Sequence, residues 1–236
     1  MDLNKKILKD LNKYKDNVFA KYQSTYFQVC NGGYGVGDIF LGVKVKLQRY
    51  IAMEYCDYIT LKDTELLLQC EIHEARFIAL LILIRKYKIA NFNLKLYIYE
   101  IYLRNFMYIN NWDLVDLSAP CIPGQYWHDY STKDLWEYAY SKILWKERVA
   151  IVSTLYFIKN ERFIETLKLS KLFFSNKHHL IYKASGWMLR EIGKINKKCL
   201  ISFLDTYCKI MPRIMLRYSI EKLSVDEKKY FLRKNN

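Results

Sequence analysis

The chain has 236 residues, of which 52% are hydrophobic, and a formal net charge of +14. This length and hydrophobic content allow a sizeable core and exclude a disordered chain. With only 3 prolines and 8 glycines, the sequence has too few turn residues for a sandwich of many short strands, so long helices are favoured.

Apolar residues recur at helical spacing from the N-terminus onward. Ile7, Leu11 and Tyr14 are three or four residues apart, as on one face of an α-helix. The same periodicity predicts helices over residues 17–29, 44–56, 60–70, 72–88, 93–109, 111–120, 132–141, 143–159, 162–174, 178–195, 197–210 and 213–223.

Helix start signals support several of these boundaries. Ser131 followed by Asp134 fits an N-cap with an acidic residue in the first turn, and Ser224 with Glu227 fits a capping box. Pro212 suits the first turn of the last long helix, where a missing backbone N–H does no harm.

Two stretches interrupt the helical pattern. The glycine-rich residues 31–38 fit neither the GxGxxG pattern nor a P-loop, because Asp38 stands where a P-loop needs lysine. We therefore predict a tight connection between helices there. Residues 119–130, which include two prolines and Gly124, are predicted to form a surface loop.

Short joints between helices of this length favour antiparallel pairs. A row of such pairs is an all-α solenoid of HEAT-like repeats, with units of roughly 40 residues. We predict one such domain over residues 1–236. A compact, irregular helical bundle is the alternative architecture.

Basic residues are concentrated in the second half of the chain. Between Lys142 and Arg213 there are 15 basic and 5 acidic residues. Clustering of this kind is typical of nucleic-acid binding. The alternative is a basic surface that is only solvated and binds no partner.

The stretch NWDLVD at residues 111–116 is the most informative motif. Trp112 and Asp116 are four residues apart and share one face of a helix. An indole ring beside a carboxylate suits a cationic ligand. The alternative is a core tryptophan beside a solvated aspartate.

Two later helices carry further candidates. Trp145 and Arg148 share a face, and Arg148 has the fork geometry for a phosphate or for an interhelical salt bridge. Trp187 and Arg190 share a face of the predicted helix 178–195, in which Gly186 is costly and permits the close approach of a neighbouring backbone. A core role is the alternative for Trp187.

Arg213 and Arg217 are four residues apart in the last predicted helix. They form a basic ridge that could follow a phosphate backbone, and a solvated helix face is the alternative.

Other classes of site have little support in the sequence. None of the four histidines or six cysteines has zinc-ligand spacing, and no nucleophile motif is present. We expect no metal and no cofactor. The longest apolar run, residues 77–84, is too short to span a bilayer, and the N-terminus is charged throughout. A cytoplasmic protein without a membrane partner is expected.

Five motifs in register resemble the AlkD-type family of DNA alkylation-repair glycosylases. They are NWDLVD at 111–116, W..RVAIV at 145–152, KASGWMLRE at 183–191, PR..LRY.IE at 212–221 and GYG.GD.FLGV at 33–43. The order and spacing agree over most of the chain.

The resemblance implies a HEAT-like solenoid with a concave, basic DNA-binding face. It implies excision of cationic alkylated purines, such as 3-methyladenine and 7-methylguanine, without the enclosed pocket in which most glycosylases bury a flipped base. The implied partner is duplex DNA that contains alkylated bases, bound by a monomer that associates with the nucleoid through DNA.

The resemblance also implies roles for individual residues. Trp112 and Trp187 would flank the damaged nucleotide, Asp116 would lie beside its anomeric carbon, and Arg148 would grip a phosphate. As the glycosidic bond breaks, positive charge moves onto the sugar, and a fixed carboxylate stabilises that state. The other expected DNA contacts are Arg190, Lys183, Arg213, Arg217, Lys44, Arg49, Tyr26, Phe27 and Tyr34.

The sequence departs from the family pattern at a few positions. Tyr156 stands where a characterised relative has lysine, and Lys44 where it has glutamine. His178 and His179 replace aromatic residues near the expected DNA face.

We therefore predict a monofunctional alkylpurine DNA glycosylase that leaves an abasic site. A non-enzymatic HEAT-repeat protein that binds distorted or branched DNA is the alternative. A helical scaffold for acidic protein partners is a third class, which the joint presence of Trp112, Asp116, Arg148 and Trp187 disfavours.

Overall fold

The computed structural model describes residues 3–235 of the chain. Within them the fold is all-α: no β-strand forms, and a single isolated β-bridge joins Ile39 to Ile72. The chain divides into two compact units, Met1–Ile122 and Pro123–Asn236. The prediction of one domain over residues 1–236 stays a prediction, and each unit is described by itself.

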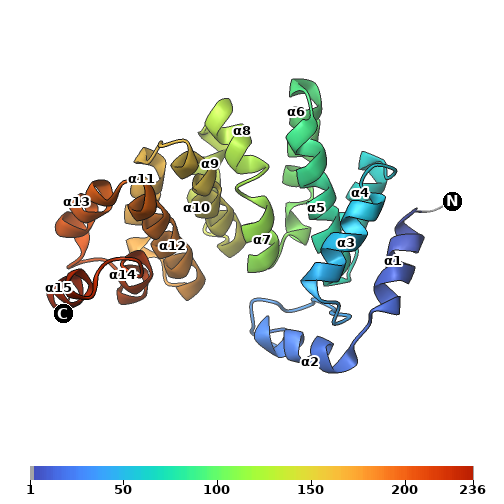
Figure 1. Ribbon diagram of the computed structural model, residues 1–236, viewed down its shortest axis with the longest axis horizontal. Helices are drawn as coiled ribbons and strands as arrows, with labels where there is room; N and C mark the ends of the chain where they lie inside the picture. Colours follow the sequence, from blue (N-terminus) through green and yellow to red (C-terminus); the bar gives the residue numbers. More distant parts are fainter. Residues whose placement is uncertain (1–2, 236) are drawn as a thin grey trace. The chain divides into compact units, whose positions relative to one another are not determined.

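The first unit holds seven α-helices and a short 3₁₀ helix among its described residues (Figure 1). Their bounds are α1 Leu3–Lys13, α2 Asn17–Tyr26, α3 Val45–Tyr55, α4 Leu61–Leu68, α5 His73–Ile89, α6 Phe92–Arg104, η1 Phe106–Tyr108 and α7 Trp112–Ser118. Helices α1, α3, α5 and α7 pack against one another in that order, so alternate helices form a row, as expected of an α-solenoid. The long α5 is the centre of this unit.

The second unit repeats this arrangement. Its described helices are α8 Pro123–Asp129, α9 Lys133–Ala139, α10 Leu144–Lys159, α11 Ile164–Leu172, η2 Phe173–Ser175, α12 His179–Ile195, α13 Lys197–Tyr207, α14 Arg213–Ser219 and α15 Val225–Lys234. Helices α8, α10, α12 and α14 form one row, while α9, α11 and α13 pack beside it. The predicted all-α solenoid fold is thus confirmed in each unit, and the HEAT-like character of the helix pairs stays a prediction.

Most predicted helices lie within a few residues of their observed bounds. The capping box is present, because Ser224 and Glu227 exchange hydrogen bonds at the start of α15. At α9 the N-cap is Thr132 and not Ser131, although Asp134 does lie in the first turn. Helix α14 ends at Ser219, four residues before its predicted end.

The predicted surface loop over residues 119–130 is wrong. Residues Pro123–Asp129 form α8, in which Pro123 is the first residue. Proline is harmless there, because the first N–H groups of a helix have no intrahelical partner. Trp127 is only 1% exposed and anchors the helix to the core, so burial outweighs the turn-forming tendency of Gly124.

The glycine-rich stretch is a non-helical connection between α2 and α3, as predicted. At Gly42 the backbone has a φ of 82°, and a Cβ atom would lie 2.0 Å from the carbonyl oxygen of Asp16. Only glycine permits both this conformation and this close approach, which places the start of α2 against the connection.

Candidate functional site

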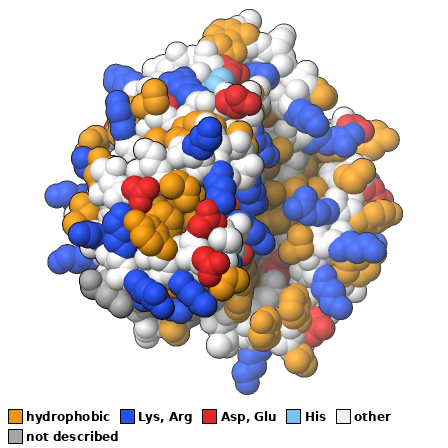
Figure 2. Space-filling view, turned by 60° about the vertical axis from the view of Figure 1, so that its left-hand side comes forward, with side chains coloured by type: hydrophobic (Ala, Val, Ile, Leu, Met, Phe, Trp, Pro, Cys, Tyr) orange, Lys and Arg blue, Asp and Glu red, His pale blue; other side chains and the backbone are white. Residues whose placement is uncertain are grey.

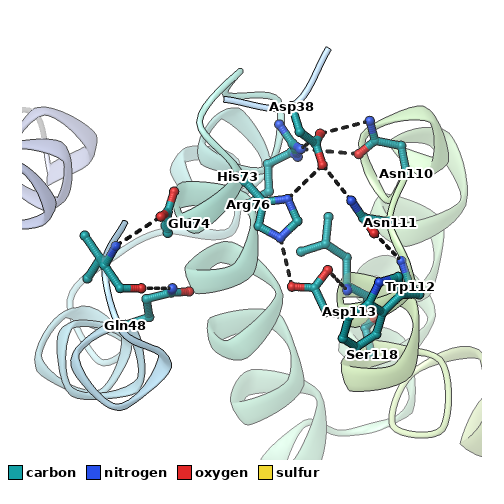
Figure 3. Close-up of polar contacts among 12 residues, drawn as sticks. Asp38, Gln48, His73, Glu74, Arg76, Asn110, Asn111, Trp112, Asp113 and Ser118 are labelled. Carbon is teal, nitrogen blue, oxygen red and sulfur yellow. Dashed lines mark hydrogen bonds and ion pairs between the residues drawn. The ribbon is translucent and has the colours of Figure 1, made fainter. Parts of the chain in front are cut away.

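A buried histidine is the centre of a polar network in the first unit. His73, the first residue of α5, is 2% exposed. Its Nδ1 lies 3.0 Å from a carboxylate oxygen of Asp38, and its Nε2 lies 2.9 Å from one of Asp113 (Figure 3). Since only the doubly protonated imidazole carries a proton on both nitrogens, this geometry suits an imidazolium cation.

The charges around His73 favour this cation. Burial by itself would lower the pKa of His73, but the charge and hydrogen bond of Asp113, together with those of Asp38, outweigh it and raise the pKa to about 9. Burial would raise the pKa of Asp38, yet hydrogen bonds from His73 and Asn111 and the charges of His73 and Arg76 lower it. At neutral pH the network therefore holds a cation between two carboxylates.

Asp38 joins three segments of the unit. Its carboxylate accepts hydrogen bonds from the Arg76 guanidinium on α5, from Asn110 Nδ2 at 3.2 Å and from Asn111 Nδ2 at 2.9 Å. Asp38 itself belongs to the glycine-rich connection and is 5% exposed. One buried carboxylate thereby ties the connection, α5 and the start of α7 together.

Helix α7 is held at both ends. Its N-cap is Asn111, whose Oδ1 accepts from the backbone N–H of Trp112 at 2.8 Å. Asp113, in the first turn, contacts His73 as described above. At the other end, the Ser118 hydroxyl is buried and lies 3.1 Å from the Tyr102 hydroxyl of α6. Side chains carried by α7 therefore have a fixed support.

A second buried carboxylate holds the connection in place. Glu74 is fully buried and accepts from the backbone N–H groups of Leu41 at 3.1 Å, Gly42 at 2.9 Å and Val43 at 3.2 Å. These three donors satisfy a charge that would otherwise be costly to bury. The segment before α3 is consequently fixed against α5.

The structure brings the N-terminal aromatic candidates to Trp112. The Trp112 ring stacks on Phe27 with a centroid distance of 5.1 Å and meets the edge of Tyr26 at 5.9 Å. The Tyr34 hydroxyl donates to the carbonyl oxygen of Tyr26 at 3.4 Å. Phe27 is buried, whereas Tyr26 is 54% exposed. The three N-terminal aromatic candidates thus lie together with Trp112.

Asp116 lies one helical turn after Trp112. Both belong to α7 and both are half-buried. The predicted shared helical face is therefore present, with the aromatic cluster at one end and a carboxylate at the other.

Arg148 is buried in the second unit. It lies on α10, is 5% exposed, and donates from Nη1 to the carbonyl oxygen of Leu180 at 2.7 Å. This contact joins α10 to the first turn of α12. The phosphate contact expected of Arg148 stays a prediction.

Glu191 organises the candidate face of α12. Its carboxylate accepts from Trp187 Nε1 at 3.1 Å, from Arg190 Nε at 3.4 Å and from Lys194 Nζ at 2.7 Å. Arg190 also forms an ion pair with Glu221. Trp187 and Arg190 are both half-buried, so the predicted face exists and its charges are partly paired within the unit.

Lys183 and Arg217 line the same groove between α12 and α14, which has a volume of about 370 Å³. Gly186 makes this approach possible, because a Cβ atom there would lie 2.5 Å from the carbonyl oxygen of Met215. Arg213 is exposed and donates to the carbonyl oxygen of Leu232 at 2.7 Å.

The basic candidate residues lie along one row of helices in each unit. In the first unit Lys44, the N-cap of α3, and Arg49 on α3 are exposed, and α3 belongs to the same row as α5 and α7. In the second unit the candidates lie on α10, α12 and α14, again a single row. On the face drawn in Figure 2, Lys and Arg side chains are spread widely, with hydrophobic side chains between them.

The sequence did not reveal the network around His73. From the sequence, His73 has no metal-ligand spacing, and Asp38 is part of a glycine-rich stretch that does not fit a P-loop. An aspartate that ends a glycine-rich stretch and a histidine that begins an apolar helix are weak signals. Their pairing across 35 residues requires the tertiary structure.

In the part of the chain that the structure describes, no group of three or more His, Cys, Asp or Glu residues could hold a metal ion. None of the helices within residues 3–235 combines the length and the apolar character that a membrane span requires.

Comparison with known proteins identifies the family. The family model described as DNA alkylation repair enzyme matches residues 7–223. No curated protein matches. A solved structure described as a predicted DNA alkylation repair enzyme from Enterococcus faecalis superposes with a TM-score of 0.70 at 16% identity, over 89% of this chain and 97% of that one. That likeness shows a shared fold, and the family match shows that the chain belongs to the DNA alkylation repair enzymes, which act on alkylated DNA.

Proposed function

We propose that the protein is a monofunctional DNA glycosylase that excises cationic alkylated purines, such as 3-methyladenine and 7-methylguanine, from duplex DNA. The observation that carries this proposal is the pairing on α7 of Trp112 with Asp116, one turn apart and supported by the rings of Tyr26 and Phe27. Aromatic faces attract a cationic base, and the carboxylate complements its charge.

The proposed reaction is hydrolysis of the N-glycosidic bond. Alkylation leaves the purine positively charged, so the bonding electron pair departs with the base, which becomes neutral. Positive charge then develops on the sugar, where the Asp116 carboxylate stabilises it electrostatically. Water adds to the anomeric carbon and loses a proton, which leaves an abasic site and an intact strand.

The network around His73 supports this mechanism, because electrostatic catalysis requires a charge that is already in place. The first turn of α7 is fixed by two hydrogen bonds, which Asn111 Oδ1 accepts from the Trp112 N–H and the Asp113 carboxylate accepts from His73. Asp116 is carried by the next turn of the same helix, so we propose that the network positions its carboxylate.

DNA would be held by the basic candidates of both units. Lys183 and Arg217 line one groove together with Glu221, and we propose that these two basic side chains contact phosphates. Trp187 keeps its proposed role at the damaged nucleotide. The remaining proposed DNA contacts are Arg148, Arg190, Arg213, Lys44, Arg49 and Tyr34.

Lesion specificity tests this proposal. The protein should release 7-methylguanine from methylated duplex DNA and leave abasic sites without strand breaks. If no closed pocket encloses the base, bulky cationic adducts should also be released, whereas uracil, a neutral base with a strong glycosidic bond, should not. Efficient uracil release or complete rejection of bulky cationic adducts would contradict the mechanism.

A further inference from the structure

Helix α2 leaves its apolar side chains uncovered. It has ten residues, and the single residue that it buries is the polar Gln23. Val18 is 83% exposed, Tyr22 60% and Tyr26 54%. A surface helix usually turns its apolar stripe toward the core, so this helix is exceptional within the unit. In Figure 1 it lies at the edge of the unit, below α1 and α3.

Three aromatic rings form a ladder along the exposed side of α2. Phe19 and Tyr22 lie 6.0 Å apart between ring centroids with an interplanar angle of 14°, and Tyr22 and Tyr26 have the same distance and angle. The ladder leads to the candidate site, because Tyr26 contacts the ring of Trp112 at 5.9 Å. The exposed aromatic surface is therefore continuous with the site on α7.

The ladder's spacing determines how a flat ligand could bind. A base inserted between two rings needs about 7 Å between them, twice the 3.4 Å spacing of stacked bases. The rings are nearly parallel and their centroids are 6.0 Å apart, so no base fits between them, and a base would stack on a ring face that is exposed to solvent. Such a platform accepts any base, because every base has a π-face.

Charges near the ladder favour a nucleic acid over an apolar partner. Between residues 10 and 37 the charged residues are three lysines, Asp10 and Asp16, and Lys13 is already paired with Asp10. The Asp16 carboxylate already accepts from the backbone N–H groups of Val18 and Phe19, at 3.0 Å each, where it caps α2. Lys15 and Lys21 are both exposed. Aromatic rings with lysines beside them are the usual construction of a single-strand binding surface.

We propose that Phe19, Tyr22 and Tyr26 form a stacking platform for unpaired nucleotides of the DNA, next to the site on α7. This inference rests on the proposed function, which supplies DNA as the ligand. It adds a preference for substrates that have a single-stranded stretch beside the duplex. The platform has no sequence preference, since it recognises ring faces.

Binding to gapped DNA by the full chain tests the platform. The probes are an undamaged, fluorescently labelled duplex and the same duplex with a gap of a few nucleotides opposite an intact strand, measured by anisotropy at one fixed salt concentration. Tyr22→Ala should weaken binding to the gapped duplex by about tenfold, within the range measured for loss of one stacked base. Binding to the continuous duplex should change less than about twofold.

Two matched variants isolate the ring. Tyr22→Phe keeps the π-face and should bind the gapped duplex as the wild type does, whereas Tyr22→Leu keeps apolar bulk and should lose affinity as Tyr22→Ala does. Tyr58→Ala removes a tyrosine that is 77% exposed, outside the ladder, and should change nothing. Circular dichroism checks that each variant is folded.

Several outcomes would overturn the platform. One is wild-type affinity of Tyr22→Ala for the gapped duplex, and another is an equal loss for both duplexes. Self-association that Tyr22→Ala abolishes would assign the ladder to a second copy of the chain. The excision assay separates the two proposals. If the protein excises 7-methylguanine but Tyr22→Ala binds gapped DNA as the wild type does, only the platform is refuted. If the protein excises nothing but needs Tyr22 to bind gapped DNA, only the glycosylase proposal is refuted.

Discussion

His73 shows how one residue can organise the candidate site. Burial of an ionised group is costly unless each charge has a partner, and the loss of one partner from a buried ion pair is strongly destabilising. Here the cation contacts Asp38 and Asp113, and Asp38 has further donors in Arg76 and Asn111. The arrangement is therefore satisfied only while His73 is protonated.

Stability should consequently depend on the protonation of His73. Its pKa is raised from 6.5 to about 9, so its contribution is fully present below about pH 6.5 and is lost as the pH rises through about 9. His73→Gln should cost about 3 kcal/mol of unfolding free energy near neutral pH. The difference between wild type and variant should shrink between about pH 7 and about pH 10.

Urea denaturation of both proteins across this pH range measures that difference. His128→Gln is the control, because the ion pair of His128 with the neighbouring Asp129 lies near the surface, where the His128 side chain is 23% exposed, and its ring packs on Tyr156 and Phe157. A difference between wild type and His73→Gln that stays constant with pH would show that His73 is neutral in the folded protein.

At the residue scale the sequence was informative where a motif is local. The NWDLVD stretch places Trp112 and Asp116 on one helix, and both residues were predicted. It also contains Asp113, an acidic residue in the first turn of α7. The contact of Asp113 with His73, 40 residues earlier, depends on how α5 packs on α7, which no local pattern encodes.

At the element scale, the packing of α12 on α14 depends on one glycine. A Cβ atom at Gly186 would lie 2.5 Å both from the carbonyl oxygen of Met215 and from the Cβ of Tyr218. These are backbone or near-backbone atoms that cannot rotate away. The groove lined by Lys183 and Arg217 therefore depends on Gly186.

Gly186→Ala should destabilise the protein by about 1–3 kcal/mol, as overpacking does, despite the better helix propensity of alanine. Gly193→Ala on the same helix is the matched control, since its Cβ would meet only the movable end of the Leu200 side chain at 2.5 Å. It should be neutral or stabilising by up to about 1 kcal/mol. Equal unfolding free energies for the two variants would refute this account of the helix contact.

Element prediction failed where burial outweighed a local preference. The prolines and Gly124 favoured a loop over residues 119–130, but Trp127 packs into the core and α8 forms around it. A seven-residue helix has only two turns, so too few apolar residues repeat for the sequence pattern to indicate a helix there. Longer helices such as α5, α10 and α12 were predicted to within one residue at each end.

At the scale of the whole molecule, a net charge of +14 should make DNA binding strongly dependent on salt. The logarithm of the binding constant should fall with the logarithm of the salt concentration by roughly 0.9 for each phosphate neutralised. Lys183→Ala, in the row that carries the candidates, should reduce this slope by about one.

Lys168→Ala is the matched control, because Lys168 is exposed on α11, outside that row. Its slope should equal that of the wild type. If both variants reduce the salt slope equally, the net charge of the whole surface attracts the DNA and this row of helices has no special role. A binding constant unaffected by salt would contradict phosphate recognition altogether.

The class of fold could be predicted because it depends on properties distributed along the chain. Helical periodicity, sparse glycine and proline and short joints all indicated helix pairs. The packing order of the helices could not be predicted, because it results from side-chain fit between distant segments. This order makes alternate helices neighbours and brings Lys183 and Arg217 to one groove.

We propose that the Asp116 carboxylate promotes excision by its charge. The most direct measurement is the single-turnover rate of 7-methylguanine release from methylated duplex DNA by the wild type and by Asp116→Asn, which keeps the shape and removes the charge. Binding to the duplex should be unchanged or tighter, while the rate should fall by about two orders of magnitude, as the loss of one preorganised electrostatic group commonly costs ~3 kcal/mol. A folded, DNA-bound Asp116→Asn protein that excises at the wild-type rate would contradict the account, and a wild type that releases no base would favour a DNA-binding role without catalysis.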